Sequence, residues 1–423
     1  MSADLDGRRA PSQVTDGSRL ASAVRQHALV LPTSDDRASL GDVLPAAAGA
    51  LLAGDGVDGP PTDGSPTDGP GQDGHGDWEA ARRRLGLPAT ARVCVVLVDG
   101  LGHLNLAERS GHAPFLRRAA ADSVPLTSTF PSTTATALGT FGTGLGPGAT
   151  GMLGYTVRVP GSGALANLVH WTGVPEPEQW QPHASTFDRL VAAGARVTSV
   201  GPARFAGSGL TRAALRGGQY QQAESLAERV DAALAALRRP GLVYLYWGDV
   251  DKVGHHRGVA SREWGDALAD ADGELGRLAR SVPRGCVLVV TADHGMIDVD
   301  RTQRWDVAHD ERLAAGVALV AGEPRASQLH LAPGASAAQV RDVWADVLGD
   351  AAVVLTRDEA VAAGLLGTVE DRVRPVVGDV LVAMTGAATV VDTRTQTAAS
   401  LDMVGVHGSL TAHEMLVPGI VLA

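Results

Sequence analysis

Three short apolar runs, far apart in the chain, each lead into side chains of the types that bind metal ions. The runs are residues 93–98, 242–247 and 287–290, and the side chains that follow them are Asp99, Asp251, His255, Asp293 and His294. Short apolar runs bounded by turn residues are typical of buried strands in a parallel sheet. Functional residues of such sheets gather at the carboxyl ends of the strands. The sequence therefore predicts one site assembled from three separate segments.

Helical patterns alternate with these runs. Amphipathic segments at residues 221–239 and 260–280 stand on either side of the run at 242–247. Alternating strand and helix patterns indicate a mainly parallel sheet flanked by helices. We predict an α/β fold with three layers, α/β/α, around a mainly parallel central sheet. A further helix and several strand patterns at about residues 323–385 predict a smaller inserted lobe.

Two segments lack the apolar residues that packing requires. Residues 1–26 are polar and have no sustained period, and residues 54–77 are mostly Gly, Pro and Asp, with PTDG repeated. We expect a disordered N-terminal tail and a flexible insertion, within a domain that spans residues 27–423. A calcium-binding repeat is the alternative for the insertion, but its spacing fits no ion-binding loop that chemistry justifies.

Charge and hydropathy limit the class of protein. The net charge of −11 argues against a general nucleic-acid-binding surface. The sequence has no apolar run near the roughly 18 residues of a membrane span and no secretory signal at its N-terminus. We expect a cytoplasmic protein that acts without a membrane, and the oligomeric state stays open. Cys94 and Cys286 lie inside apolar runs and are expected to be core residues rather than a disulfide.

The residues at the predicted strand ends suit divalent ions. A single strand-end Asp is most often a helix cap, but three such ends with carboxylates and imidazoles favour a metal site. Asp251 and His255 face the same side if their segment is helical. Gly254 disfavours a full helix, so a loop is the alternative. The glycine after Asp293 and His294 permits a turn in which both reach one ion. With His407 near the C-terminus, the set predicts two metal ions about 4 Å apart, a site for phosphoryl transfer.

These motifs resemble the alkaline-phosphatase superfamily, and most closely its nucleotide pyrophosphatase/phosphodiesterase branch. D-x-x-G-H-x-x-G is present at residues 251–258, and A-D-H-G-M at 292–296. The late HG of the family is matched by His407, and the Glu-Met pair that follows it begins at Glu414. The resemblance covers roughly residues 92–423.

The resemblance implies two ions held by six side chains. One ion would be bound by Asp251, His255 and His407, and the other by Asp99, Asp293 and His294. The ions of the family are usually zinc. Three nitrogen and oxygen ligands with an open position also suit catalytic zinc, with manganese as the alternative.

The family nucleophile is a threonine at the N-terminus of a helix, nine residues before the Thr of a TG pair. Counting back from Thr143 gives Thr134, and the family's P-x-x-T also matches at residues 131–134. A T-F-P string points instead to Thr129, and Thr133 is a third candidate. A hydroxyl at a helix N-terminus beside a dication is favoured as an alkoxide, so we favour Thr134.

One departure from the family concerns substrate binding. The family's phosphate-binding Asn is replaced here by Tyr155, whose phenol can donate one hydrogen bond. The resemblance implies a two-metal hydrolase that acts through a phospho-threonine intermediate on a small phosphorylated substrate, with diesters or pyrophosphates favoured. The alternatives are a phosphomonoesterase, a phosphonate or sulfate ester hydrolase on the same fold, and a metal-binding protein without turnover.

Overall fold

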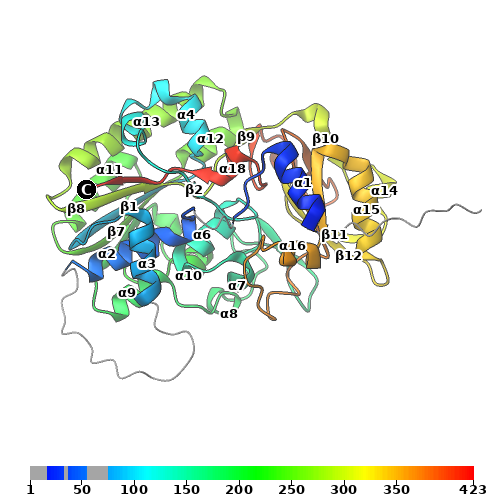
Figure 1. Cartoon of the computed structure of the whole chain (residues 1–423), viewed down its shortest axis with the longest axis horizontal. Helices are drawn as coiled ribbons and strands as arrows, with labels where there is room; N and C mark the ends of the chain where they lie inside the picture. Colours follow the sequence, from blue (N-terminus) through cyan, green and yellow to red (C-terminus); the bar gives the residue numbers. More distant parts are fainter. Residues whose placement is uncertain (1–16, 33–36, 55–74) are drawn as a thin grey trace, which may run out of the picture.

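The three apolar runs form neighbouring strands of one sheet in the computed structural model, which describes residues 17–32, 37–54 and 75–423 (Figure 1). β1 (Arg92–Val98) lies between β7 (Gly241–Trp247) and β8 (Cys286–Thr291), and both pairings are parallel. β5 (Val197–Gly201) and β6 (Gln219–Gln222) extend the sheet in parallel, while β18 (Ile420–Leu422) is antiparallel to β8. The order is β18-β8-β1-β7-β5-β6, which confirms the predicted mainly parallel sheet.

Helices cover both faces of this sheet, so the predicted three layers are present (Figure 1). One face carries α2 (Val43–Leu52), α3 (His75–Leu85), α6 (Thr134–Thr143) and α9 (Thr186–Ala192). The other carries α5 (Pro114–Ala119), α11 (Leu226–Ala236) and α13 (Arg262–Ser281). The two long amphipathic segments of the sequence are α11 and α13.

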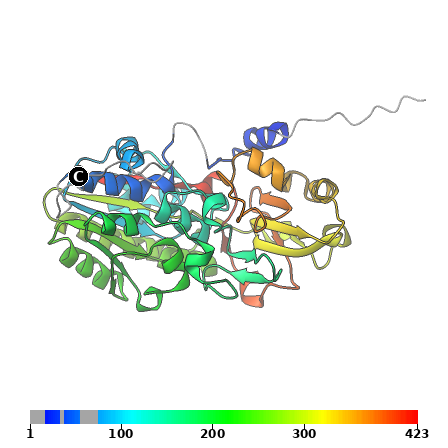
Figure 2. The ribbon, with the colours of Figure 1, turned by 90° about the horizontal axis from the view of Figure 1, so that it is seen from below.

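A second sheet forms a lobe beside the first (Figure 2). Its antiparallel strands are, in order, β13 (Ala352–Thr356), β14 (Val380–Met384), β12 (Ala326–Leu331), β11 (Val317–Glu323), β3 (Thr156–Arg158) and β4 (Leu165–Asn167). α15 (Ala337–Leu348) packs on β13, and Trp344 is fully buried in a separate apolar cluster. The predicted lobe of residues 323–385 therefore begins earlier in the structure and also takes two strands from the segment after α6. It is extended further by β10 (Arg304–Asp306) paired with β15 (Thr389–Val391).

The N-terminal prediction needs a correction. Residues 17–26 were expected in a disordered tail, but they belong to α1 (Gly17–His27), which lies against the lobe (Figure 2). Leu20, Ala23 and Val24 have helical spacing and pack on the core, and Leu20 is buried. The remainder of that predicted tail, residues 1–16, lies outside the described residues, as do residues 55–74 of the predicted insertion. The insertion's last residues, 75–77, begin α3.

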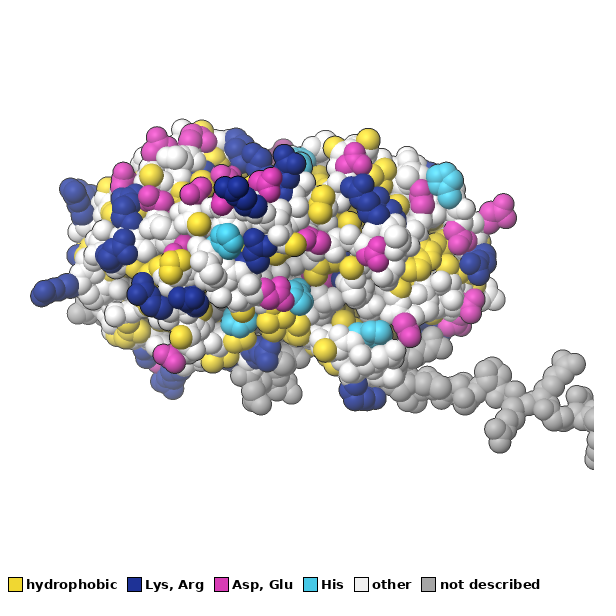
Figure 3. Space-filling model, turned by 90° about the horizontal axis from the view of Figure 1, so that it is seen from above, with side chains coloured by type: hydrophobic (Ala, Val, Ile, Leu, Met, Phe, Trp, Pro, Cys, Tyr) yellow, Lys and Arg dark blue, Asp and Glu magenta, His cyan; other side chains and the backbone are white. Residues whose placement is uncertain are grey.

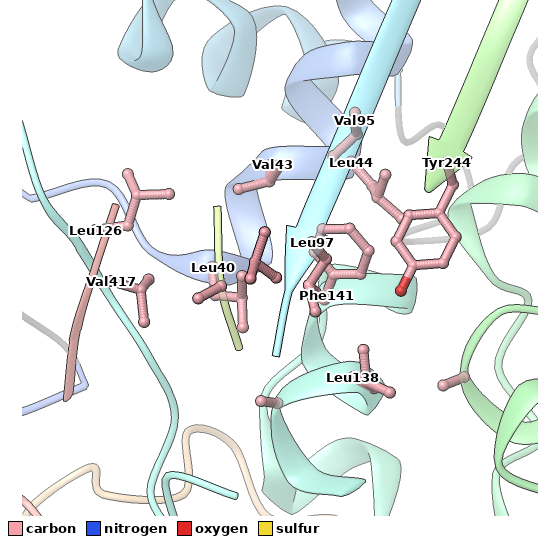
Figure 4. Packing of buried hydrophobic residues seen from close by; sticks show 14 of the residues in the cluster. Leu40, Val43, Leu44, Val95, Leu97, Leu126, Leu138, Phe141, Tyr244 and Val417 are labelled. Carbon is pink, nitrogen blue, oxygen red and sulfur yellow. The ribbon is translucent and has the colours of Figure 1, made fainter. Parts of the chain in front are cut away.

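The main core fixes α6 against the sheet (Figure 4). Leu138 and Phe141 of α6 lie beside Leu97 of β1 and Tyr244 of β7, and Phe141 and Tyr244 have ring centroids 5.6 Å apart. Cys94 and Cys286 are buried free thiols within the strands, as expected for core residues. This packing sets where the first turn of α6 lies relative to the strand ends.

On the surface, basic and acidic side chains are interspersed over the face in Figure 3. Within the described residues, no helix combines the length and the hydropathy that crossing a bilayer requires.

Candidate active site

The carboxyl ends of β1, β7 and β8 bring the predicted metal ligands together. Asp99 directly follows β1, and Asp293 and His294 come two and three residues after the last residue of β8. Asp251 and His255 lie on α12 (Asp249–Arg257), one turn apart, so the segment whose conformation the sequence left open is helical.

A glycine allows α12 to lie this close to the strand ends. A Cβ atom at Gly254 would stand 2.4 Å from the Met296 sulfur. Glycine has a low helix propensity, but its lack of a side chain lets α12 pack beside the segment that contains Asp293 and His294. Close approach, not a turn, explains this glycine.

One group of ligands forms around Asp251. Its carboxylate oxygens lie 3.4 Å from Nε2 of His255 and 3.9 Å from Nε2 of His407. His407 comes from the loop after β16 (Gly405–Val406), which pairs with β9 (Ile297–Asp298) just beyond Asp293-His294. This pairing is how a residue near the C-terminus reaches the ends of the central strands.

A second group forms around His294. Its Nε2 atom lies 3.5 Å from Oδ1 of Asp99 and 3.5 Å from Oδ2 of Asp293. Asp251 also has a ligand atom within 4.8 Å of those of Asp99 and His294, so it stands within reach of both groups. All six predicted ligands thus line one continuous site, with Asp251 between the two groups.

Backbone carbonyls fix the orientation of all three imidazoles. In each ring the Nδ1–H group donates to a backbone carbonyl oxygen. His255 donates to Gly405 at 2.8 Å, His294 to Gly295 at 3.0 Å, and His407 to Ser132 at 3.0 Å. A carbonyl can only accept, so Nδ1 carries a proton in each ring and Nε2 is the nitrogen left to bind an ion. The Nε2 atoms face the carboxylates, which is the arrangement of metal-ligating histidines.

The buried carboxylates of the site favour a bound cation. One oxygen of each carboxylate has no hydrogen-bond partner among the described residues: Asp99 Oδ1, Asp251 Oδ1 and Asp293 Oδ2. Burial, reinforced by the neighbouring carboxylates, raises the pKa of Asp99 well above its usual range and also raises that of Asp293. Burial and the adjacent imidazoles lower the pKa of His407 well below its usual range. Imidazole nitrogens and crowded carboxylates are the donor set that a divalent ion stabilises.

The three candidate nucleophiles differ in what they contact. Thr134 is the first residue of α6, and its Oγ1 lies 3.2 Å from Nε2 of His294. The Thr129 hydroxyl donates to the carbonyl of Pro131 at 2.8 Å and is buried. Thr133 is the N-cap residue, and its hydroxyl faces Glu323. Thr134 is therefore the candidate whose hydroxyl is directed at a predicted metal ligand.

Two cavities meet at the ligand cluster. The larger, about 470 Å³, is lined by Thr134 and Asp99 and by aromatic residues that include Phe205. The smaller, about 310 Å³, extends between the cluster and the lobe. Tyr155 lines both cavities and is 38 % exposed, which places it where a bound substrate would lie.

Sequence reasoning missed Tyr246, whose hydroxyl donates to Oδ2 of Asp99 at 2.6 Å. It also missed Glu323, a buried acid at the end of β11 in the wall of the smaller cavity. The register of β7 against β1 places Tyr246 beside Leu97, close to the strand end. Glu323 comes from the lobe, and no spacing in the sequence connects it with the strand ends.

Comparisons with known proteins agree with this geometry. The solved structures that the fold resembles include murine ectonucleotide pyrophosphatase / phosphodiesterase 5, with a TM-score of 0.61 and 18% identity, covering 77% of this chain and 87% of that one. They also include phosphonoacetate hydrolase from Sinorhizobium meliloti in complex with phosphonoacetate, with a TM-score of 0.61 and 22% identity, covering 79% and 90%.

The sequence comparisons are of two kinds. A phosphopentomutase from Desulfitobacterium hafniense is 28% identical over 147 residues, which span 34% of this chain and only about a third, 36%, of that protein. The family model for type I phosphodiesterase / nucleotide pyrophosphatase matches residues 93–410, a range that contains all six ligands and all three threonines. The chain therefore belongs to the type I phosphodiesterase / nucleotide pyrophosphatase family, within the alkaline-phosphatase superfamily.

Proposed function

We propose that the protein is a phosphodiesterase that hydrolyses small phosphodiesters with Thr134 as nucleophile and two divalent ions, zinc or manganese, as cofactors. The observation that carries the proposal is the 3.2 Å contact between the Thr134 hydroxyl and His294, at the N-terminus of a helix and inside a cluster of three carboxylates and three imidazoles. Membership of a family of phosphodiesterases and pyrophosphatases supports the reaction class.

The donor set fits two ions. Asp251, His255 and His407 would hold one, and Asp99, Asp293 and His294 the other. When bound, such ions polarise phosphoryl oxygens and favour deprotonated oxygen nucleophiles. The carboxylate oxygens without hydrogen-bond partners among the described residues support this assignment, because they are costly to bury without a cation.

The chain's own residues define the reaction. The first turn of α6 presents unpaired backbone N–H groups, and their partial positive charge favours an alkoxide at Thr134. Oγ1 of Thr134 gives up its proton and attacks phosphorus, the bond from phosphorus to the leaving oxygen breaks, and a phospho-threonine forms. The leaving oxygen takes up a proton and departs as the alcohol. Water then attacks that phosphorus, and the bond from phosphorus to Oγ1 of Thr134 breaks. Oγ1 takes up a proton from the attacking water, which restores the threonine hydroxyl. Tyr155, exposed beside the cluster, can donate a hydrogen bond to a phosphoryl oxygen.

The two cavities favour a diester over a monoester. Both reach the cluster, and Thr133, Tyr155, His255 and His407 line both of them. A phosphorus atom with two substituents can place one substituent in each cavity, whereas a monoester leaves one of them empty. Phosphonate hydrolysis is the second candidate, because Arg204 in the larger cavity offers a cation to a second anionic group.

Purified full-length protein, dialysed against a strong chelator and reconstituted with zinc or manganese, tests the proposal. Bis(4-nitrophenyl) phosphate should be hydrolysed faster than 4-nitrophenyl phosphate or phosphonoacetate, only with metal, and elemental analysis should find about two ions per chain. Turnover that survives complete removal of metal would reject the metal assignment. No turnover of any of the three substrates by the reconstituted protein would reject the function.

A further inference from the structure

We propose that the smaller cavity receives the leaving alcohol of the diester and selects alcohols that carry no negative charge. The inference rests on the proposed function and narrows its substrates from small phosphodiesters in general to diesters of neutral or cationic alcohols. Its basis is the position of this cavity relative to Thr134 and the charges in its wall.

The position follows from the geometry of attack. In phosphoryl transfer the attacking and leaving oxygens lie roughly in line, on opposite sides of phosphorus. Thr134 and Asp99 line the larger cavity, next to His294. The smaller cavity is lined by His255 and His407 but not by Thr134 or Asp99. A group that departs away from Thr134 therefore enters the smaller cavity.

Apolar residues and uncharged polar groups form most of the wall of this cavity. The lining includes Leu165 and Val320 of the lobe and, from the loop after β15, Thr395 and Gln396. No Lys or Arg is among its lining residues, all of which lie in the described part of the chain. A leaving group with a negative charge would find no opposite charge in this wall.

The two acids in the wall differ in their partners. Asp392 is held by Arg394 through two hydrogen bonds of 2.8 and 2.7 Å, so its charge is compensated. Glu323 is 8 % exposed, and neither of its carboxyl oxygens has a hydrogen-bond partner among the described residues. The hydroxyl of Thr133 and the amide of Tyr155 face it, and burial raises its pKa to about 8.

Glu323 therefore disfavours anions in the cavity. Above about pH 8 this carboxyl is ionised, and an anionic leaving group brought beside it would then meet a like charge in a wall of low polarity, where such repulsion is strong. A neutral alcohol meets no such penalty, and an ammonium group would supply the positive charge that the carboxylate lacks. The leaving group of a pyrophosphate bond is itself a phosphate, so this cavity favours diesters over pyrophosphates.

A series of diesters tests the inference. Each has the same phenyl arm, and the leaving nitrophenol is unsubstituted, carries a carboxylate or carries a trimethylammonium group. The quantity compared is kcat/KM divided by the rate of alkaline hydrolysis of the same ester. Rates are measured at about pH 9, where the Glu323 carboxyl with its pKa of about 8 is ionised, and at 0.15 M salt, where charges beyond about 8 Å are screened. The reconstituted enzyme should process the neutral and cationic esters comparably and the anionic ester at least about tenfold more slowly, as expected for a like charge at short range.

Two variants and a matched control locate the effect. Glu323→Gln removes the charge at constant shape, and Thr395→Lys adds a cation at an exposed position of the rim. Both variants should reduce severalfold the difference in normalised kcat/KM between the neutral and the anionic ester. Ala399→Lys adds the same charge in the short helix α17 (Ala398–Leu401), four residues further along the chain and outside the cavity lining, and should leave the rate difference between the neutral and anionic esters unchanged. The Thr395 variant keeps the test valid if the buried Glu323 variant does not fold.

Equal normalised rates for all three esters in the wild-type enzyme would overturn the inference and leave the proposed function intact. The inference would also be overturned if Thr395→Lys, or a folded Glu323→Gln variant, left the rate difference between the neutral and the anionic ester unchanged. Absence of turnover for every ester is a different result, because it rejects the proposed function itself.

Discussion

The hydroxyl of Tyr246 donates a 2.6 Å hydrogen bond to Oδ2 of Asp99 at the edge of the central sheet. The bond leaves Oδ1 of Asp99 without a hydrogen-bond partner and directed towards Nε2 of His294, 3.5 Å away. The Tyr246 ring is itself held by Phe205, at 5.6 Å between ring centroids. If Asp99 binds an ion as proposed, fixing its second oxygen in this way preorients the first oxygen for that ion.

Replacing Tyr246 with Phe should weaken metal binding rather than abolish the reaction. Losing a hydrogen bond to a ligating carboxylate typically costs about 10–100-fold in metal affinity. We expect a rightward shift of that size when activity is titrated with zinc in a metal buffer, and near wild-type turnover at saturating zinc. A variant with unchanged zinc dependence but low turnover at saturation would contradict this role.

Replacing Thr134 with Ala should lower turnover by several orders of magnitude, because it removes the attacking oxygen. Thr134→Ser keeps that oxygen and should retain partial activity. Metal content and melting temperature should change little in both variants. Steady-state assays on the reconstituted enzyme and mass spectrometry of a trapped phospho-enzyme provide the measurement.

Thr129→Ala is the matched control for this prediction. Its hydroxyl bonds to the Pro131 carbonyl rather than to the ligand cluster, so the loss should stay within roughly tenfold. An inactive Thr129→Ala beside an active Thr134→Ala would transfer the nucleophile to the T-F-P string. Phosphate trapped on Thr133 would point to the third candidate.

A buried ion pair joins the lobe to the loop that carries His407, one of the proposed metal ligands. Arg325 donates to Glu414 at 2.7 and 3.1 Å, both side chains are fully buried, and Glu414 also accepts from the amide of Ser409, two residues after His407. Arg325→Met should lower the free energy of unfolding by about 3–5 kcal/mol, because it leaves a buried carboxylate unpaired. Urea denaturation measures this.

The double variant Arg325→Met with Glu414→Gln is the control for that experiment. It removes the unpaired charge and should recover part of the loss. A broken buried pair is expected to cost about 3–5 kcal/mol. If the free energy of unfolding of Arg325→Met differed from that of the wild type by less than about 1 kcal/mol, the pair would contribute little to stability.

His330 makes the stability of the lobe sensitive to pH. Burial, with a contribution from Arg158, lowers its pKa to about 4 from the usual value of 6.5. Between these values the unfolded chain binds a proton that the folded chain does not. Stability should therefore fall by about 3 kcal/mol as pH drops from 6.5 to 4, with no further contribution from this group below that.

The variant His330→Phe isolates that contribution. It removes the titrating ring, so the difference in unfolding free energy between wild type and variant should change in that pH window and stay constant above pH 7. Denaturant titrations at a series of pH values give the difference. A difference that is flat from pH 4 to pH 7 would assign the acid sensitivity to other groups.

Much of the fold follows from local patterns. The runs at 93–98, 242–247 and 287–290 are β1, β7 and β8, and their parallel pairing brings their carboxyl ends to one edge. The pattern at residues 17–26 shows the limit of such reasoning. Its apolar stripe is short, and only contact with the lobe makes it a stable helix, because isolated helices of this length are marginal.

The sequence alone determined which side chains stand at the strand ends, because hydrophobic runs and motif spacing are properties of neighbouring residues. The tertiary structure decided the relationships among them. It directed the Thr134 hydroxyl, rather than that of Thr129, towards His294, and it brought Tyr246 onto Asp99. Such contacts join atoms separated by more than a hundred residues, so they depend on packing and register, which no local spacing encodes.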